Sequence, residues 1–423
     1  MGKKFSIEQA ASSTTIKSKP SILAKIFKNL ILSQFRKINH GCIILNGSNK
    51  KIIFGDKGSS LKAEVNIYSD EFYILAGSGG DLGIAEAYAA GYWDADDMVK
   101  LIQIVIKNQE VQKSLEGGLA KLISPINRYI HRSRRNTVSG SKENIVAHYD
   151  LSNEFFQTWL DKSMTYSCAI FEPEDLSLFD ASREKLDRIC RKLNIQPEDH
   201  VVEIGTGWGS FAVHAVKEYG CRVTTTTISN EQHAYVSNLI EEEGLKDKIT
   251  LLKNDYRELK GQYDKLVSIE MIEAVGYNFI QQFFQTCSDL LKPNGLMAIQ
   301  GITYHEQGFD NHLNSVDFIK KYIFPGSNLI SVNHVLLVIK NFTDLSLVHL
   351  EDITKYYAET LKLWREKYKN EMSKIKKMGY SDEFLRMWDY YFIYCEAGFR
   401  ERFIGDVQLV MAKPKNKNIQ INY

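Results

Sequence analysis

The sequence has little of what marks several large classes of protein. Only 7 of its 423 residues are proline, which excludes collagen-like and proline-rich disordered chains. The 6 cysteines are scattered without a C-x-x-C pair, so we expect neither a disulfide scaffold nor a metal site, and a reducing cytosol fits best. We find no secretory signal and no apolar run approaching the roughly 18 residues of a membrane span. What remains is a chain of ordinary composition, long enough for two or three domains.

The sequence also has no excess of positive or negative charge. Lys and Arg total 53 against 52 Asp and Glu, a formal net charge of +1. Binding to the nucleic-acid backbone needs a clustered basic excess, so we expect no nucleic-acid partner. The balance does not exclude local basic patches, and residues 17–37 form one, with six Lys or Arg and no acid.

Within that patch the spacing predicts an amphipathic helix. Its apolar residues form one stripe at i, i+3, i+4 spacing: Ile22, Leu23, Ile26, Phe27, Leu30 and Ile31. Lys25 and Lys28 fall elsewhere on the helix. Two interpretations stay open: a helix that packs its stripe on the core, and a helix that lies on an anionic lipid surface.

The pattern divides the chain into two domains joined by a linker. Residues 40–76 alternate as strands do, and an alanine-rich helical segment follows; we assign 1–130 to a smaller α+β domain. Residues 131–144 are polar and basic and are the best candidate linker. From 145 to 423, strands alternate with helices of about a dozen residues, which predicts a doubly wound α/β domain with a mostly parallel sheet. The candidate strands are His200–Ile204, Arg222–Thr227, Ile249–Leu252, Lys265–Glu270, Leu296–Ile302 and Val407–Met411.

A glycine-rich turn follows the first of these strands. Glu203 precedes Gly205, Gly207 and Gly209, which alternate and open a helix. This is G-x-G-x-G rather than the G-x-G-x-x-G of dinucleotide sites, and the second strand ends in threonines without a carboxylate for a ribose diol, so a nicotinamide enzyme is disfavoured. An acid before G-x-G-x-G resembles motif I of class I methyltransferases, which implies S-adenosylmethionine as cofactor. The resemblance implies cofactor contacts at Tyr166, Ser167, Glu203, Gly205, Gly207, Trp208, Gly209, Thr227, Ile228, Gln232, Asp255 and Tyr256.

Segments on both sides of the turn resemble one family in order. They are residues 147–156, 164–171, 227–232, 271–276, 322–326, 357–361 and 395–400. These closely resemble signature segments of cyclopropane-fatty-acyl-phospholipid synthases and cyclopropane mycolic acid synthases, from about residue 140 to the C-terminus. Residues 83–94 resemble the N-terminal domain of the bacterial phospholipid enzymes more weakly. The resemblance implies a Rossmann-like seven-stranded catalytic domain, a lipid-docking and dimerising N-terminal domain, and a cytoplasmic enzyme held at the inner face of the membrane as a homodimer.

The family chemistry implies a second small ligand. A cis double bond of a phospholipid acyl chain takes the methyl group, and a base removes a proton from the resulting carbocation so that a cyclopropane ring closes. The resemblance implies bicarbonate as that base, in a cage of Cys168 (backbone), Glu273, Gln300, Ile302 (backbone) and Tyr357. We favour this role for both residues over the alternatives, in which Cys168 is a small buried hydrophobe and Tyr357 a core residue.

Gln300 leaves the structure of the methylated product undecided. The family usually has His where Gln300 stands, and an amide cannot shuttle a proton. We expect ring closure to a cyclopropane fatty acid, and two alternatives stay open: a methyl-branched or methylene chain, and a non-catalytic lipid-binding relative. Cys395 is a further catalytic candidate, but methyl transfer to an alkene needs no covalent enzyme intermediate, so we expect it to pack near the pocket. The aromatic segment 388–392 lines an acyl tunnel or belongs to the core.

Overall fold

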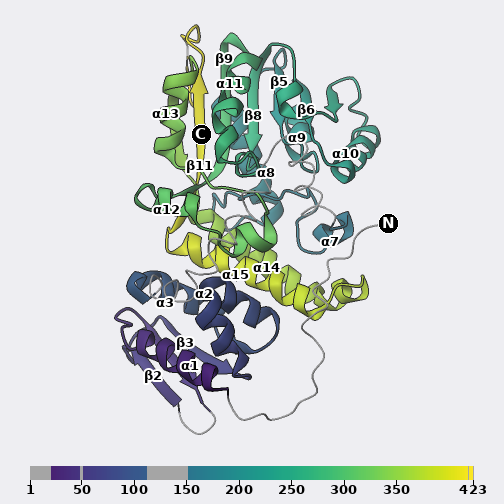
Figure 1. The fold of residues 1–423 in the computed structure, drawn as a ribbon. Coiled ribbons are helices and arrows are strands. Elements are labelled where there is room, and N and C mark those ends of the chain that lie inside the picture. Colours follow the sequence, from purple (N-terminus) through teal and green to yellow (C-terminus); the bar gives the residue numbers. More distant parts are fainter. Residues whose placement is uncertain (1–20, 48–50, 112–150, 418, 423) are drawn as a thin grey trace.

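The computed structural model describes residues 21–47, 51–111, 151–417 and 419–422, and Figure 1 shows two sheets separated by a layer of helices. The predicted linker 131–144 and the start of the first signature segment, 147–150, lie outside these residues. No helix of the described ranges is long and apolar enough to cross a membrane.

The N-terminal part is a small α+β unit, as predicted. Its elements are α1 Ile22–Phe35, β1 Cys42–Asn46, β2 Lys51–Gly55, β3 Lys62–Ile67, α2 Glu71–Ala89, β4 Trp93–Ala95 and α3 Met98–Lys107. The strands form a sheet of order β2-β1-β3-β4, in which β1 and β3 are parallel and the other pairs are antiparallel. Helix α1 packs against α2, and α3 packs against β3.

The second part is the predicted doubly wound domain. Its first half holds α7 Asn153–Gln157, α8 Leu178–Leu193, β5 His200–Ile204, α9 Ser210–Tyr219, β6 Arg222–Thr226, α10 Asn230–Glu242, β7 Ile249–Leu252, β8 Tyr263–Ile269 and α11 Ile280–Leu290. Its second half holds β9 Leu291–Tyr304, α12 Phe309–Asn314, α13 Val332–Phe342, β10 Ser346–Asp352, α14 Thr354–Lys377, α15 Asp382–Arg400 and β11 Ile404–Ala412. The sheet order is β10-β11-β9-β8-β5-β6-β7, parallel from β7 to β9 and antiparallel at β11 and β10. All six predicted strands are present, and β10 is an edge strand that we did not predict.

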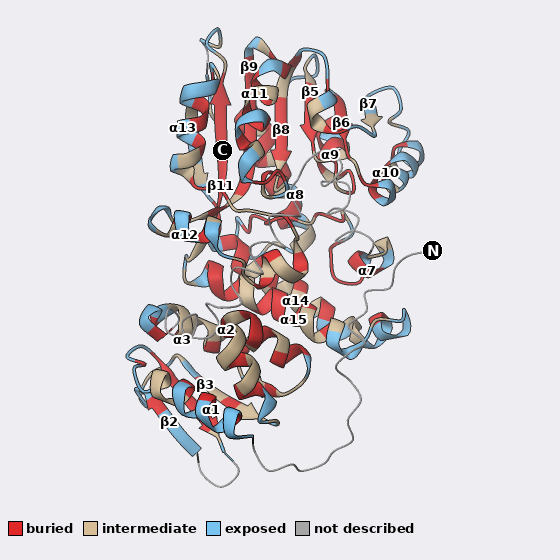
Figure 2. Cartoon of the chain, viewed as in Figure 1, coloured by how far each residue is buried: buried red, intermediate tan, exposed pale blue. Residues whose placement is uncertain are grey.

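Two helices from the end of the chain join the domains. Helices α14 and α15 pack together, and α15 also packs against α2 and α3. Figure 2 shows that the buried residues of α14 and α15 continue the interior of the large sheet toward the small domain. Trp388 and Phe392 are buried in this junction. The Tyr88 hydroxyl of the small domain donates a hydrogen bond to Asp389 across it at 2.9 Å. The predicted aromatic segment therefore forms core at some positions, while Tyr390 and Tyr391 also line a cavity.

The amphipathic helix α1 is present, but its apolar stripe is divided. Phe27 and Ile31 face inward and are about 4 % exposed. Ile22 is 79 % exposed, and three more large apolar residues, Leu23, Ile26 and Leu30, are each about half exposed. Neither a purely core-facing stripe nor a purely outward one describes this helix, because α2 covers only one side of it.

Candidate active site

The glycine turn after β5 presents bare backbone at the carboxyl edge of the sheet. Gly205, Gly207 and Gly209 have φ of +98°, +54° and +87°, conformations that favour glycine. A Cβ on Gly205 would lie 2.9 Å from the side chain of Met271, whereas a Cβ on Gly207 would meet nothing within 4 Å. Gly207 therefore borders open space at the N-terminus of α9, which is where a cofactor approaches in folds of this type.

The predicted cofactor residues gather around this edge. Glu203, at the end of β5, is buried; burial raises the pKa of its carboxyl to about 8, and the Thr225 hydroxyl donates to it at 2.6 Å. After β6, the Thr227 hydroxyl donates to Gln232 Oε1 at 2.8 Å, with Ile228 between β6 and α10. Because β5 and β6 are adjacent and parallel, their carboxyl ends place these groups on one rim. Glycine backbone and a rim of polar groups fit S-adenosylmethionine.

The remaining predicted cofactor residues are fixed by partners within the chain. The Trp208 indole donates to Asn153 at 2.8 Å, the Tyr166 hydroxyl donates to Tyr391 at 3.0 Å, and Ser167 accepts from the fully buried Lys185 at 2.7 Å. After β7, both oxygens of the Asp255 carboxylate are held by Arg257 at 2.6–2.7 Å. The Tyr256 ring packs 5.4 Å from that of Phe283, so it forms an apolar wall beside β7.

The cage predicted for bicarbonate is present, but a side chain of the protein occupies its donors. Glu270 Oε1 accepts from the Cys168 backbone N–H at 2.8 Å and from Gln300 Nε2 at 2.8 Å. Glu270 Oε2 accepts from the Tyr357 hydroxyl at 2.5 Å. Glu270 follows β8 with φ +46°, in the left-handed region that non-glycine residues rarely adopt. Three of the five predicted groups thus converge on one carboxylate of the chain itself.

The other two groups of the predicted cage bind each other. Glu273 Oε1 accepts from the Ile302 backbone N–H at 2.5 Å, and Glu273 Oε2 is buried without a partner. Burial, reinforced by the Glu270 charge, raises the pKa of Glu273 to about 8, so it is mostly protonated at neutral pH. The residues present do not fit a free bicarbonate, because Glu270 and Glu273 already engage every predicted donor.

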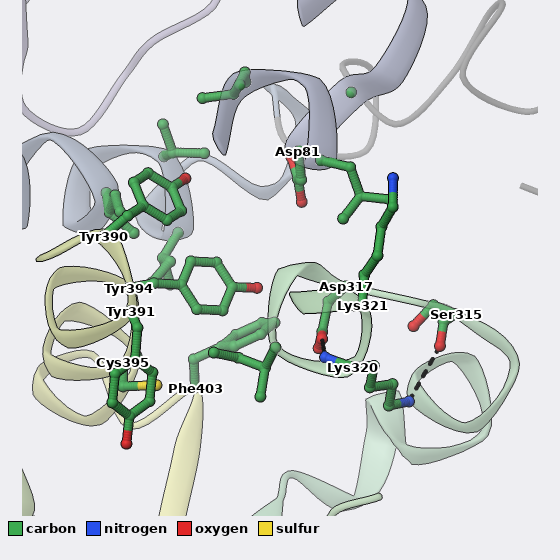
Figure 3. A pocket seen from close by; sticks show the side chains of 18 of the residues that line it. Asp81, Ser315, Asp317, Lys320, Lys321, Tyr390, Tyr391, Tyr394, Cys395 and Phe403 are labelled. Carbon is green, nitrogen blue, oxygen red and sulfur yellow. Dashed lines mark hydrogen bonds between the residues drawn. The ribbon is translucent and has the colours of Figure 1, made fainter. Parts of the chain in front are cut away.

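A cavity of about 1190 Å³ runs from this carboxylate into the N-terminal domain. Glu270, Glu273 and Tyr357 line one end, and Ile31 and Phe35 of α1 line the other. Figure 3 shows the polar middle, where Tyr391, Tyr394 and Cys395 of α15 lie across from Asp317, Lys320 and Lys321. The volume exceeds the roughly 300–1,000 Å³ of ordinary ligand pockets, and much of the wall is apolar, as a long acyl chain requires.

The two cysteines of the prediction carry no thiol chemistry. Burial raises the pKa of Cys168 and of Cys395, so neither forms a thiolate nucleophile. The Cys168 backbone N–H donates to Glu270, and Cys395 lies on the cavity wall.

Three residues of this site were not predicted. Glu270 was assigned to the end of a strand, and its position three residues before Glu273 was the available signal. Asp406 is 0 % exposed in β11 and accepts from Gln300 at 3.2 Å, and Lys185 is buried in α8. Asp406 was marked in the sequence as a lone acid inside an apolar segment, whereas Lys185 stands among other charged residues of α8 and carried no such mark.

Comparison with known proteins decides the family. A family model described as mycolic acid cyclopropane synthetase matches residues 137–409. The chain belongs to this family. As a member it is an S-adenosylmethionine-dependent fatty-acid methyltransferase.

Relatives of the family agree in sequence and in structure. The chain is 34% identical over 350 residues to tuberculostearic acid methyltransferase UfaA1 of Mycobacterium tuberculosis, covering 80% of each chain. It is 31% identical over 374 residues to the cyclopropane-fatty-acyl-phospholipid synthase of Escherichia coli K12, covering 86% of this chain and 91% of the relative. Mycolic acid cyclopropane synthase CmaA1, solved in complex with SAH and CTAB, superposes with a TM-score of 0.61 at 28% identity, covering 64% of this chain and 98% of that one.

Proposed function

We propose that this methyltransferase acts on the cis double bond of an unsaturated acyl chain of a membrane phospholipid and yields a branched chain, with Glu270 as the base. The observation that carries the proposal is the Glu270 carboxylate, which stands at the cavity wall where the predicted bicarbonate donors meet. The similarity to a relative named for tuberculostearic acid, and Gln300 in place of the usual His, favour branching over ring closure.

The proposed reaction proceeds in three steps, the last of which uses Glu270. S-adenosylmethionine supplies an electrophilic methyl group on a sulfonium. The alkene electron pair forms the new C–C bond, the S–C pair returns to sulfur, and the acyl chain becomes a carbocation. A hydride shift from the neighbouring carbon moves the positive charge to the methyl-bearing carbon. Glu270 then takes a proton from the methyl group, and the C–H pair forms a methylene double bond. Glu270 is suited to this because three hydrogen bonds fix its carboxyl group at the wall of a largely apolar cavity.

Product structure tests the proposal. The enzyme is incubated with vesicles of an oleoyl phospholipid and cofactor labelled with ¹³C at the methyl group, and the extracted lipid is examined by NMR. We expect the label in vinylidene =CH₂ signals. Cyclopropane signals instead would restore the ring-forming reaction, and tight cofactor binding without any labelled lipid would favour a lipid-binding protein.

We also propose that α1 docks the protein on an anionic bilayer. Its outer face exposes Ile22, Leu23, Ile26 and Leu30, with basic Lys25 and Lys28 on the same helix, while Ile31 and Leu32 line the cavity. Apolar residues flanked by lysines are typical of an interfacial helix. A helix that touches both the lipid surface and the cavity gives an acyl chain a short way in.

Vesicle binding tests this docking. Lys25→Glu with Lys28→Glu should reduce sedimentation with vesicles rich in phosphatidylglycerol, since each basic residue near an anionic surface contributes about 1 kcal/mol. The same reversal at Lys217 and Lys246, exposed on the large domain, is the matched control and should bind as the unmodified chain does. Equal binding of all three proteins would overturn the proposed surface.

A further inference from the structure

Two carboxyl groups share one amide next to the cavity. Gln300 Nε2 donates to Glu270 Oε1 at 2.8 Å and to Asp406 Oδ2 at 3.2 Å. Asp406 lies in β11, beside β9 in the register Asp406–Ile302, and none of its surface is exposed. One NH₂ group that contacts both acids brings them close together in a dry site.

The hydrogen bonds on the two acids are unequal. Glu270 accepts three, from Cys168 N, Gln300 Nε2 and Tyr357 OH, all of which stabilise an anion. Asp406 accepts the longer contact from Gln300, and its Oδ1 is buried without a partner. An unpartnered buried oxygen is costly on a carboxylate but suits a protonated carboxyl group.

The charges around Asp406 also favour its protonated form. It faces Glu270 after β8, Glu273 of the next turn, the Cys168 thiol, the Tyr357 hydroxyl of α14 and the Lys185 ammonium of α8. Burial first, then the negative charge of Glu270, raises the pKa of Asp406 well above its ordinary value, and Lys185 opposes them only in part. The single buried ammonium of Lys185 faces both Glu270 and Asp406 and cannot compensate two carboxylates, so these two groups are not ionised together.

We propose that Asp406 is a positioning residue that holds a proton in the resting enzyme and thereby keeps its neighbour Glu270 ionised and ready to accept the substrate proton. This inference rests on the role proposed for Glu270. The pair carries one proton before turnover and two after it, so the site never holds two adjacent negative charges. The proton taken from the substrate then leaves Glu270 before the next turnover.

Infrared spectroscopy tests the protonation state without requiring turnover. The full chain is produced with aspartate ¹³C-labelled at the side-chain carboxyl, and we expect the C=O band of a protonated aspartic acid at pH 7, shifted by the label and lost in Asp406→Asn. Asp389→Asn is the control, because Asp389 is also buried but paired with Arg365 at 2.6 Å, and this substitution should leave the labelled band in place. Absence of the labelled band in the unmodified chain, at every pH at which it remains folded, would overturn the proposal even if Asp406→Asn failed to fold.

The pH profile of kcat gives a second readout. If Asp406 is neutral, Asp406→Asn replaces one neutral group by another, and the acid limb stays at the same pH. If Asp406 is ionised, the substitution removes a buried negative charge beside Glu270 and should move the acid limb to lower pH, which would overturn the proposal. Failure of the Glu270 proposal looks different: Glu270→Gln would then turn over normally, whatever the infrared band shows.

Discussion

Replacing Glu270 by glycine should make the reaction depend on a base added to the solution, because the base of the chain itself is then absent. The substitution removes the carboxylate and leaves three donors, Cys168 N–H, Gln300 NH₂ and Tyr357 OH, directed at an empty space. Backbone strain does not oppose the change, because Glu270 has φ +46° and glycine adopts that conformation freely. We expect turnover to fall by about 10²–10⁴-fold, the usual contribution of a positioned base.

Added bicarbonate should then restore turnover. Hydrogen bonds to a charged group contribute about 1.5–3 kcal/mol each, so two or three of them, less the cost of immobilising the ion, give about 4 kcal/mol, or a Kd of roughly 1 mM. The assay is the initial rate of labelled methyl incorporation into oleoyl phospholipid in CO₂-free buffer, titrated with bicarbonate. Glu270→Gln is the matched control: its amide fills the same space without being a base, so it should be slow and bicarbonate should not rescue it. Full activity of the glycine variant without bicarbonate, or equal rescue of both variants, would refute the reasoning.

Three further substitutions test neighbouring parts of the account. Gly207→Ala should weaken binding of S-adenosylhomocysteine at least tenfold by calorimetry while the protein stays folded, since the new Cβ enters open space at the cofactor edge; unchanged affinity would place the cofactor elsewhere. Tyr357→Phe should lower kcat 10–100-fold and leave cofactor affinity unchanged, because the hydroxyl contacts Glu270 and not the glycine turn; unchanged kcat would show that the Tyr357–Glu270 contact does not matter. Burial raises the pKa of Glu273 from 4.5 to about 8, so its contribution to stability is complete below pH 4.5 and is lost as pH rises toward 8. Between pH 5 and pH 7 the unmodified chain should therefore lose roughly 3 kcal/mol of unfolding free energy through Glu273, and Glu273→Gln should not show this loss. Urea denaturation at both pH values measures it. The same pH dependence of the unfolding free energy in both proteins would mean that Glu273 is ionised in the folded state.

The sequence was most informative where local chemistry determines structure. β5 and the helix after it begin where predicted, because a β-branched run followed by alternating glycines permits little else. Edge strand β10 was missed because most of its residues are partly exposed and mixed in polarity, which gives neither an apolar run nor a clean alternation.

The active site was less predictable, because side-chain direction is not a property of spacing. Glu270 was taken as the end of a strand, and only the left-handed turn at that residue aims its carboxylate at Cys168 and Tyr357. Asp406 reaches it through the antiparallel pairing of β11 with β9, which brings together positions far apart in the chain. The divided face of α1 has the same cause: periodicity shows that a helix has an apolar side, but α2 determines which part of that side is covered.

The central claim is that a carboxylate of the chain does the work of a diffusible base. Its most direct test is the turnover of the unmodified enzyme in rigorously CO₂-free buffer, measured before and after bicarbonate is added. With Glu270 seated among all its donors, the rate should be the same in both conditions. A rate that collapses without bicarbonate and returns with it would contradict the account.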